Sequence, residues 1–229
     1  MIFDAPTLSR GWLSVAQASC ADKEAVILHK TIAIEVYSTG LRLTATDRFV
    51  LLTAWVPDLG HGIEDEPAIE EAPDRTVVVQ DADGRGKGLL AYLLALVARK
   101  ERELDSQLPH GQMQASVELD VRMPDGTSPD EDVALEGMEP TYAVIDIPDT
   151  ERVYLPVIES AYPDWRRIRG DHQAEQTDTI LIHPDRLGPL AKAGRWAEGG
   201  VLWTFGGEQR TALIEWPSSD PHVTGGVMP

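Results

Sequence analysis

The chain has 229 residues, a formal net charge of −18 and 42% hydrophobic residues. This length and hydrophobic content predict one large or two small folded domains and argue against wholesale disorder. The single cysteine, Cys20, excludes an internal disulfide framework and fits a reducing compartment. The first residues lack the regions of a secretory signal, and the longest apolar stretch, 89–98, is too short to span a bilayer. We therefore expect a cytoplasmic protein that has no membrane partner.

The charged residues are distributed unevenly along the chain. A uniformly acidic surface would repel DNA, because the phosphate backbone is itself negative. The acidic residues concentrate in two predicted loops, at 58–74 and 125–132, whereas many basic residues lie on or beside predicted helices. Two interpretations stay open: ordinary exposed charges on helix faces, or basic helices that face DNA inside an acidic shell. The candidates for facing DNA are Arg85, Lys87, Arg99, Lys100, Arg186, Lys192 and Arg195.

The first predicted unit is a helix followed by a hairpin and a further strand. Apolar residues from Leu8 to Ala16 recur at helical spacing and form one stripe. Apolar and polar residues alternate on both sides of Ser38-Thr39-Gly40, which predicts the hairpin, and Pro57 ends the next strand. The strands are predicted at 32–36, 41–45 and 51–56. The acidic connection that follows, 58–75, is expected to be exposed.

The same order of elements recurs in the rest of the chain. The second helix is predicted at 89–104, and the third begins at His183-Pro184-Asp185, where a proline costs little, and runs to Trp196. The remaining strands are predicted at 76–80, 113–122, 133–136, 142–147, 153–158, 179–182, 201–205, 211–216 and 222–228. Few residues recur between the units, so the repeat is one of supersecondary structure. The pattern predicts an α+β fold of repeated units, each a helix with antiparallel strands.

Signatures of catalysis and of metal binding are weak. The glycine-rich segment 83–88 lacks the spacing of a P-loop or of a dinucleotide site, which favours a helix-entry loop. Six scattered histidines and one cysteine argue against a zinc site. Asp47 could be a catalytic acid, but a turn residue that binds local amides is favoured. We expect no catalytic residue, no metal and no cofactor.

Three short segments far apart in the chain carry the most informative pattern. They are Thr44–Leu51, Ala161–Ile168 and Gly226–Pro229. They resemble the three pieces of the peptide-binding pocket of the bacterial DNA sliding clamp, the beta subunit of DNA polymerase III. That family has a TD-x-x-x-L loop, an aromatic-Pro-Asp-aromatic-Arg-Arg linker and a V-M-P ending. Met228 has a pliable apolar side chain that suits a peptide groove, although a last strand within its own sheet is the alternative.

The resemblance implies a DNA-clamp fold, with sheets outside and helices inside a ring, and a non-catalytic processivity factor. Residues 1–168 are similar to the middle clamp domain, and residues 169–229 are similar to the C-terminal half of the last domain. Partner proteins would insert a hydrophobic peptide into a pocket between them. By position in the three segments, its residues would be Thr46, Arg48, Phe49, Val50, Leu51, Pro163, Arg167, Ile168, Val227, Met228 and Pro229.

The chain also departs from the family. It is shorter than three domains, and the first domain is not recognised in it. The loop reads Arg48-Phe49-Val50 where bacterial clamps carry a small or polar residue and then a basic one. A shortened clamp of this kind suggests a phage or mobile-element origin.

Three functions stay open. The first is a homo-oligomeric processivity clamp that encircles double-stranded DNA without sequence preference, serves a DNA polymerase and other clamp-binding proteins, and is opened by a clamp loader. The second is a clamp-like adaptor or decoy that binds the same peptides without encircling DNA. The third is an enzyme on an unrelated α+β fold. The resemblance favours the first.

Overall fold

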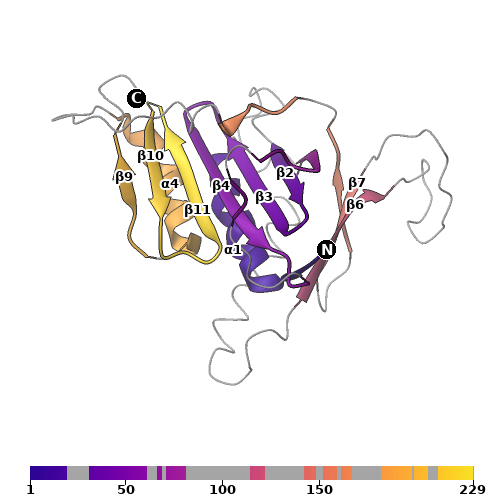
Figure 1. Ribbon diagram of the computed structural model, residues 1–229. Helices are drawn as coiled ribbons and strands as arrows, with labels where there is room; N and C mark the ends of the chain where they lie inside the picture. The colour runs from indigo at the N-terminus through magenta and orange to yellow at the C-terminus, as the bar shows by residue number, and fades with distance from the viewer. Residues whose placement is uncertain are drawn as a thin grey trace.

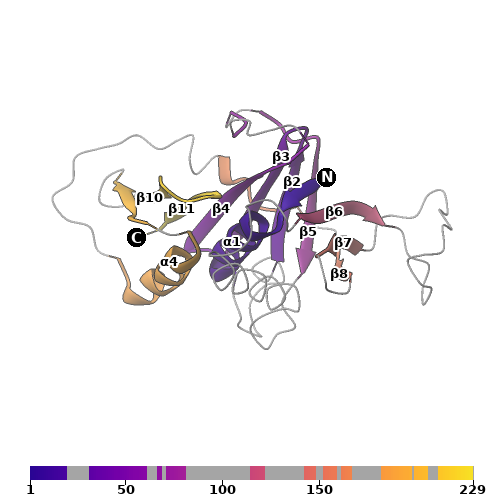
Figure 2. The ribbon, with the colours of Figure 1, turned by 90° about the horizontal axis from the view of Figure 1, so that it is seen from below.

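The protein is described here by a computed structural model, in which two helices lie on one face of a long antiparallel sheet (Figures 1 and 2). The structure describes residues 1–19, 31–60, 66–68, 71–80, 114–121, 142–147, 152–158, 161–166, 182–197, 199–205 and 211–228. Within these residues the helical segments are α1 (Ala5–Val15), the 3₁₀ turn η1 (Ala16–Ala18) and α4 (Pro184–Ala197). The strands are β1 (Ile2–Asp4), β2 (Thr31–Tyr37), β3 (Gly40–Thr46), β4 (Val50–Pro57), β5 (Arg75–Gln80), β6 (Gln114–Val121), β7 (Tyr142–Asp146), β8 (Val153–Pro156), β9 (Leu202–Thr204), β10 (Ala212–Trp216) and β11 (His222–Val227).

The long sheet joins the two ends of the chain. Its order among the described strands is β5-β2-β3-β4-β11-β10-β9, and a smaller sheet has the order β1-β6-β7-β8. The junction is the antiparallel pair of β4 and β11, in which Val50 faces Val227 and Trp55 faces His222. Strands from the first 80 residues and from the last 30 therefore form one continuous surface (Figure 1).

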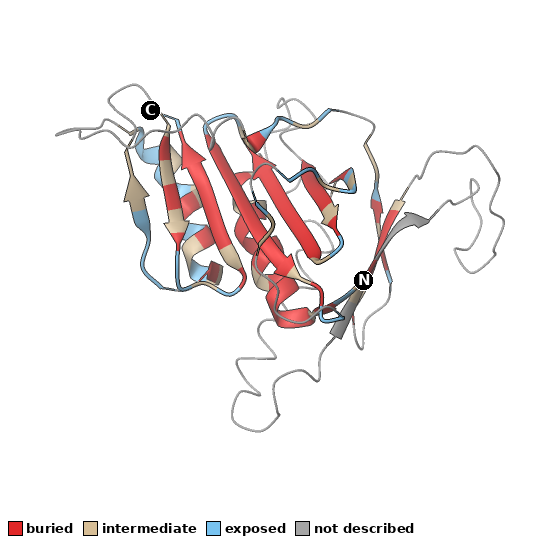
Figure 3. Cartoon of the chain, in the orientation of Figure 1, coloured by how far each residue is buried: buried red, intermediate tan, exposed pale blue. Residues whose placement is uncertain are grey.

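The core lies between this sheet and the helices. Alternate residues of the strands, such as Ile34, Leu43 and Leu52, point to the helical side and are buried. Trp12 of α1 is fully buried among them, and Figure 3 shows how burial follows the central strands. Asp4 caps α1 by accepting hydrogen bonds from the backbone nitrogen of Thr7, at 2.8 Å, and from its hydroxyl, at 2.7 Å. The amphipathic stripe thus packs as its spacing predicts.

The sequence predicted most of the described elements and missed one. The first helix, the 32–45 hairpin and the strands that became β4 to β11 lie close to their predicted positions. The leading strand β1 was not predicted, because three residues are too few to show alternation; its pairing of Ile2 with Ser116 of β6 creates it. The predicted helix 89–104 and strand 133–136, and most of the predicted strand 179–182, lie outside the described residues. The division at 168 also lies there and stays a prediction.

The sequence predicted that the acidic connection after β4 is exposed. This prediction is wrong for its first residue. Asp58 is only 6% exposed, and its Oδ1 accepts a hydrogen bond of 3.0 Å from the backbone nitrogen of Ile2. A local acidic run cannot reveal a partner that lies 56 residues away. None of the helices that the structure describes has the length and apolar character needed to cross a membrane.

Strands β4 and β11 approach each other closely at Gly225. A Cβ atom at this position would lie 2.2 Å from the carbonyl oxygen of Leu51 and 2.7 Å from the Leu52 side chain. The first of these neighbours is backbone, so it could move only if the strands moved apart. A glycine is therefore required where the two ends of the chain pair.

We predict that Gly225→Ala destabilises the protein by about 1–3 kcal/mol, as other overpacked sites do. The measurement is the free energy of unfolding in urea. Gly200→Ala is the matched control, because apart from its chain neighbours nothing lies within 4 Å of a Cβ at that position. The control is expected to change the stability by less than about 0.5 kcal/mol. Equal losses in both variants would contradict the prediction.

Candidate peptide-binding site

The loop between β3 and β4 is organised by its own polar side chains. Asp47 Oδ1 accepts hydrogen bonds from the backbone nitrogens of Phe49, at 3.0 Å, and Val50, at 2.8 Å. The hydroxyl of Thr46 donates to the carbonyl oxygen of Val50, at 2.9 Å. The favoured interpretation of Asp47 as a turn residue is thus confirmed. Arg48 has a φ of 87°, a left-handed conformation that a small residue adopts with less strain.

The end of the last strand is held against this loop. The backbone nitrogen of Met228 donates to the carbonyl oxygen of Phe49, at 2.8 Å. Arg186 of α4 donates to the carbonyl oxygen of Met228, and its guanidinium lies 4.2 Å from the centre of the Phe49 ring. Phe49 and Met228 remain 46% and 38% exposed. Arg186, a candidate for facing DNA, therefore lies beside the predicted peptide loop.

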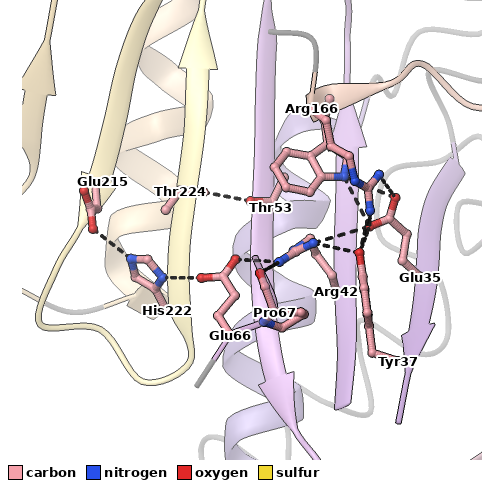
Figure 4. A network of polar contacts seen from close by, with 11 residues as sticks. Glu35, Tyr37, Arg42, Thr53, Glu66, Pro67, Arg166, Glu215, His222 and Thr224 are labelled. Carbon is pink, nitrogen blue, oxygen red and sulfur yellow. Dashed lines mark hydrogen bonds and ion pairs between the residues drawn. The ribbon is translucent and has the colours of Figure 1, made fainter. Parts of the chain in front are cut away.

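The linker segment 161–166 lies on the sheet face opposite the helices, where its tryptophan is anchored by Glu35. Trp165 is 2% exposed, and its indole nitrogen lies 3.2 Å from both carboxylate oxygens of Glu35. Arg166 forms a bidentate ion pair with the same carboxylate, at 2.7 and 2.9 Å (Figure 4). Such charge-assisted pairs are strong and directional. They hold the linker down on β2.

A second arginine lies beneath the linker. Arg42 of β3 is 1% exposed, and its guanidinium lies 4.6 Å from the centre of a Trp165 ring. It donates to the Tyr37 hydroxyl at 2.8 Å, and to Glu66 Oε1 at 3.0 Å (Figure 4). Burial raises the pKa of the Tyr37 hydroxyl, and the charge of Arg42 opposes this rise. Neutral Tyr37 can therefore donate to Glu35 while it accepts from Arg42.

The first aromatic residue of the linker, Tyr162, is half-buried. Burial raises the pKa of its hydroxyl, and the hydroxyl has no hydrogen-bond partner among the described residues. Pro163, the next residue, is exposed. Trp165 of the linker and Leu51 at the end of the loop line one small cavity, and Met228 joins the third segment to the loop.

A small cavity opens on the same outer face, between the linker and the C-terminal strands. Its volume is about 70 Å³, which is room for a branched apolar side chain. Trp165 and Leu51 line it from one side and Leu202 and Leu213 from the other. The remaining lining residues are Thr53, Thr204, Ile214, Glu215, Thr224, Gly225 and Gly226. The mixture of apolar walls with a few polar groups is typical of a specific binding site.

The predicted pocket residues fall into different surroundings. Leu51 lines the small cavity, and Pro163 lines a larger cleft of about 610 Å³ between the linker and β5. Val50 and Val227 are buried in the core, so we expect them to support the walls rather than to contact a peptide. Among the basic candidates, Lys192 and Arg195 are exposed on α4. The other predicted residues lie outside the described part of the chain: Arg167, Ile168, Pro229, Arg85, Lys87, Arg99 and Lys100.

Sequence reasoning missed the residues that build the cavity from β9 and β10 and the polar network below the linker. Leu213 and Glu215 alternate with core residues, so their face could have been found from the strand period. Glu35 and Arg42 also alternate with core residues and would be predicted to be exposed. They are buried because the linker covers them, which no local pattern shows. In the described segments, no three His, Cys, Asp or Glu side chains gather as metal ligands.

We predict that Glu35→Ala lowers the free energy of unfolding by about 3 kcal/mol, because it leaves Arg166 and Arg42 without their buried carboxylate. Urea denaturation measures the loss. Asp146→Ala is the matched control, since it removes an ion pair of 2.9 Å whose side chains are 45% and 31% exposed. The control is expected to lose far less, because water screens that pair. A loss in the control as large as in Glu35→Ala would contradict the anchoring role.

Comparison with solved structures supports the predicted fold. The chain matches no protein-family model and no curated protein. It is similar to solved structures of a putative DNA polymerase III beta subunit from Eubacterium rectale (11% identity, TM-score 0.61), a DNA polymerase sliding clamp from Bacillus subtilis (12%, 0.56) and Caulobacter crescentus pol III beta (14%, 0.55). All of this chain is covered, but only 64%, 63% and 64% of those chains. The predicted fold class is confirmed: the chain has the α+β fold of the bacterial DNA sliding clamps.

Proposed function

We propose that the protein is a processivity factor of the sliding-clamp type, which holds partner proteins, such as a DNA polymerase, by an apolar peptide side chain. The observation that carries this proposal is the cavity on the outer sheet face. It lies where the linker, β4 and the C-terminal strands meet, and its walls are mainly apolar. Burial of a peptide side chain there would contribute about 25 cal/mol per Å² of apolar area. The role requires no chemistry from the protein.

The opposite side of the molecule is the proposed DNA side. Helices α1 and α4 pack together on it, and Lys192 and Arg195 are exposed on α4. Ring closure through several copies of the chain would bring such helices around the duplex. Binding would then use phosphate contacts and be independent of base sequence.

A second candidate is an adaptor that binds the same peptides without encircling DNA. Arg10 is the single basic residue of α1, and the chain as a whole has a net charge of −18. A described helix with a single positive charge, α1, favours this candidate, because a DNA channel needs positive potential. The peptide site would be the same in both cases.

We predict that Leu202→Asp weakens the binding of a neutral leucine- and phenylalanine-containing peptide at least about tenfold, which is about 1.4 kcal/mol. Leu202 lines the cavity and is 54% exposed, so a charge can be placed there without disturbing the core. Fluorescence anisotropy of the labelled peptide measures the affinity. Leu187→Asp on α4, 42% exposed, is the matched control and should bind normally. Unchanged affinity in Leu202→Asp would contradict the peptide site.

We predict for DNA that the protein, once placed on nicked circular DNA, stays bound until the circle is cut, because a ring can slide off only at an end. The measurement is gel-filtration retention before and after linearisation. A plot of log affinity against log salt concentration has a negative slope. Replacement of Lys192 and Arg195 by alanine should make this slope less steep by roughly one to two. Dissociation from circles and linear DNA at the same rate would favour the adaptor.

A further inference from the structure

His222 lies between two carboxylates that come from different parts of the chain. Its Nδ1 is 2.8 Å from Glu66 Oε2, in the segment after β4, and its Nε2 is 2.9 Å from Glu215 Oε1 of β10 (Figure 4). An ionised carboxylate only accepts hydrogen bonds. Both ring nitrogens must therefore donate, which only the doubly protonated, positively charged ring can do.

The ion pairs continue from His222 to both sides of the cavity. Glu215, its partner on one side, lines the cavity directly. On the other side Glu66 also binds Arg42, at 3.0 Å, and Arg42 stacks on Trp165, which lines the opposite wall. His222 is thus the link between two walls that belong to β10 and to the linker.

The charges of the hydrogen-bonded groups in this network balance when His222 is protonated. In the part of the chain that the structure describes, His222 contacts Glu66 and Glu215, and their neighbours in the network are Arg42, Arg166 and Glu35. Among the described groups that hydrogen bonds join, three carboxylates then face three cations, and the exposed Asp164 lies farther off, 4.0 Å from Arg166. Loss of the proton leaves one negative charge in excess and one ring nitrogen opposite a carboxylate that cannot donate to it.

We infer that the cavity is proton-linked: the charged form of His222 holds its two walls in place, so that an apolar peptide side chain binds more tightly when this ring is protonated than when it is neutral. This inference rests on the proposed peptide function. By thermodynamic reciprocity, the bound peptide would also favour the protonated ring.

The proton affinity of His222 supports this direction. The hydrogen bond to Glu66 raises its pKa above the ordinary 6.5, burial lowers it, and the bond to Glu215 raises it again, with a net rise. A group whose pKa is higher in the folded state stabilises the fold fully below the unfolded pKa, and this contribution is lost as the pH rises through the folded pKa. The contribution of the network to stability should therefore fall on the alkaline side of 6.5.

The first experiment measures how the contribution of His222 to stability depends on pH, without any ligand. The wild type and His222→Gln are unfolded in urea between about pH 5.5 and about pH 9. The difference between their midpoints is expected to be largest at the acidic end and to shrink as the pH rises. His183→Gln removes an exposed histidine of the chain and should reproduce the wild-type profile. A difference that is constant with pH would overturn the inference.

The second experiment measures how peptide binding to the cavity depends on pH. The affinity of a rhodamine-labelled peptide of leucine, phenylalanine and serine, which has no titrating group in this range, is measured over the same pH values. The wild type should lose at least about threefold in affinity from the acidic to the alkaline end, and His222→Gln should show a flat profile. If His222→Gln does not fold, Glu215→Gln serves instead, and its profile should move to lower pH.

The outcomes separate the inference from the proposed function. A peptide that binds the wild type equally at all pH values would overturn the inference and leave the peptide site standing. No binding at any pH would overturn the proposed function and, with it, the regulation of the site. In that case the urea profiles alone would still show whether His222 is coupled to its two carboxylates.

Discussion

The arrangement of the outer sheet face depends on one buried carboxylate. Glu35 accepts hydrogen bonds from the indole of Trp165 and from both terminal nitrogens of Arg166. These contacts hold a linker segment over a sheet face that would otherwise be covered by water. The linker in turn buries Arg42 and supplies one wall of the cavity. A buried ion pair adds little net stability but fixes geometry well, and here the geometry is that of the proposed binding site.

Different interactions stabilise the two sides of the molecule. On the helical side, alternate residues of the strands and the apolar stripe of α1 form an ordinary hydrophobic core. On the outer side, the same strands present Arg42, glutamates and a histidine, which ion pairs and hydrogen bonds join, while the Nε atoms of Arg42 and Arg166 have no partner among the described residues. A core of the first kind tolerates repacking, whereas a polar network of the second kind depends on every partner being present. Specific function is more readily placed on the second side.

Much of the fold followed from the sequence, because periodicity is local. The apolar stripe of α1, the pattern of the hairpin at 32–45 and the alternation in β10 each predict the element in which they occur, without reference to distant residues. The three segments of the candidate site were found from motif resemblance, and the structure connects them through the cavity shared by Leu51 and Trp165 and through the backbone contact of Met228. The cavity itself was not predicted, since its lining joins Leu51 to Leu213 across the β4–β11 pair. Glu66 and His222 were likewise invisible, because 156 residues separate the partners.

The pairing of β4 with β11 also has a consequence for how the chain reaches its native state. About 165 residues separate the two strands, so their contact has a high sequence separation and is expected to form late and slowly. During synthesis β4 is complete long before β11 leaves the ribosome. Until then β4 presents an unpaired edge rich in leucine, valine and tryptophan, which is a template for aggregation. The folding of this protein is therefore expected to be sensitive to premature termination and to benefit from chaperones that shield a nascent strand.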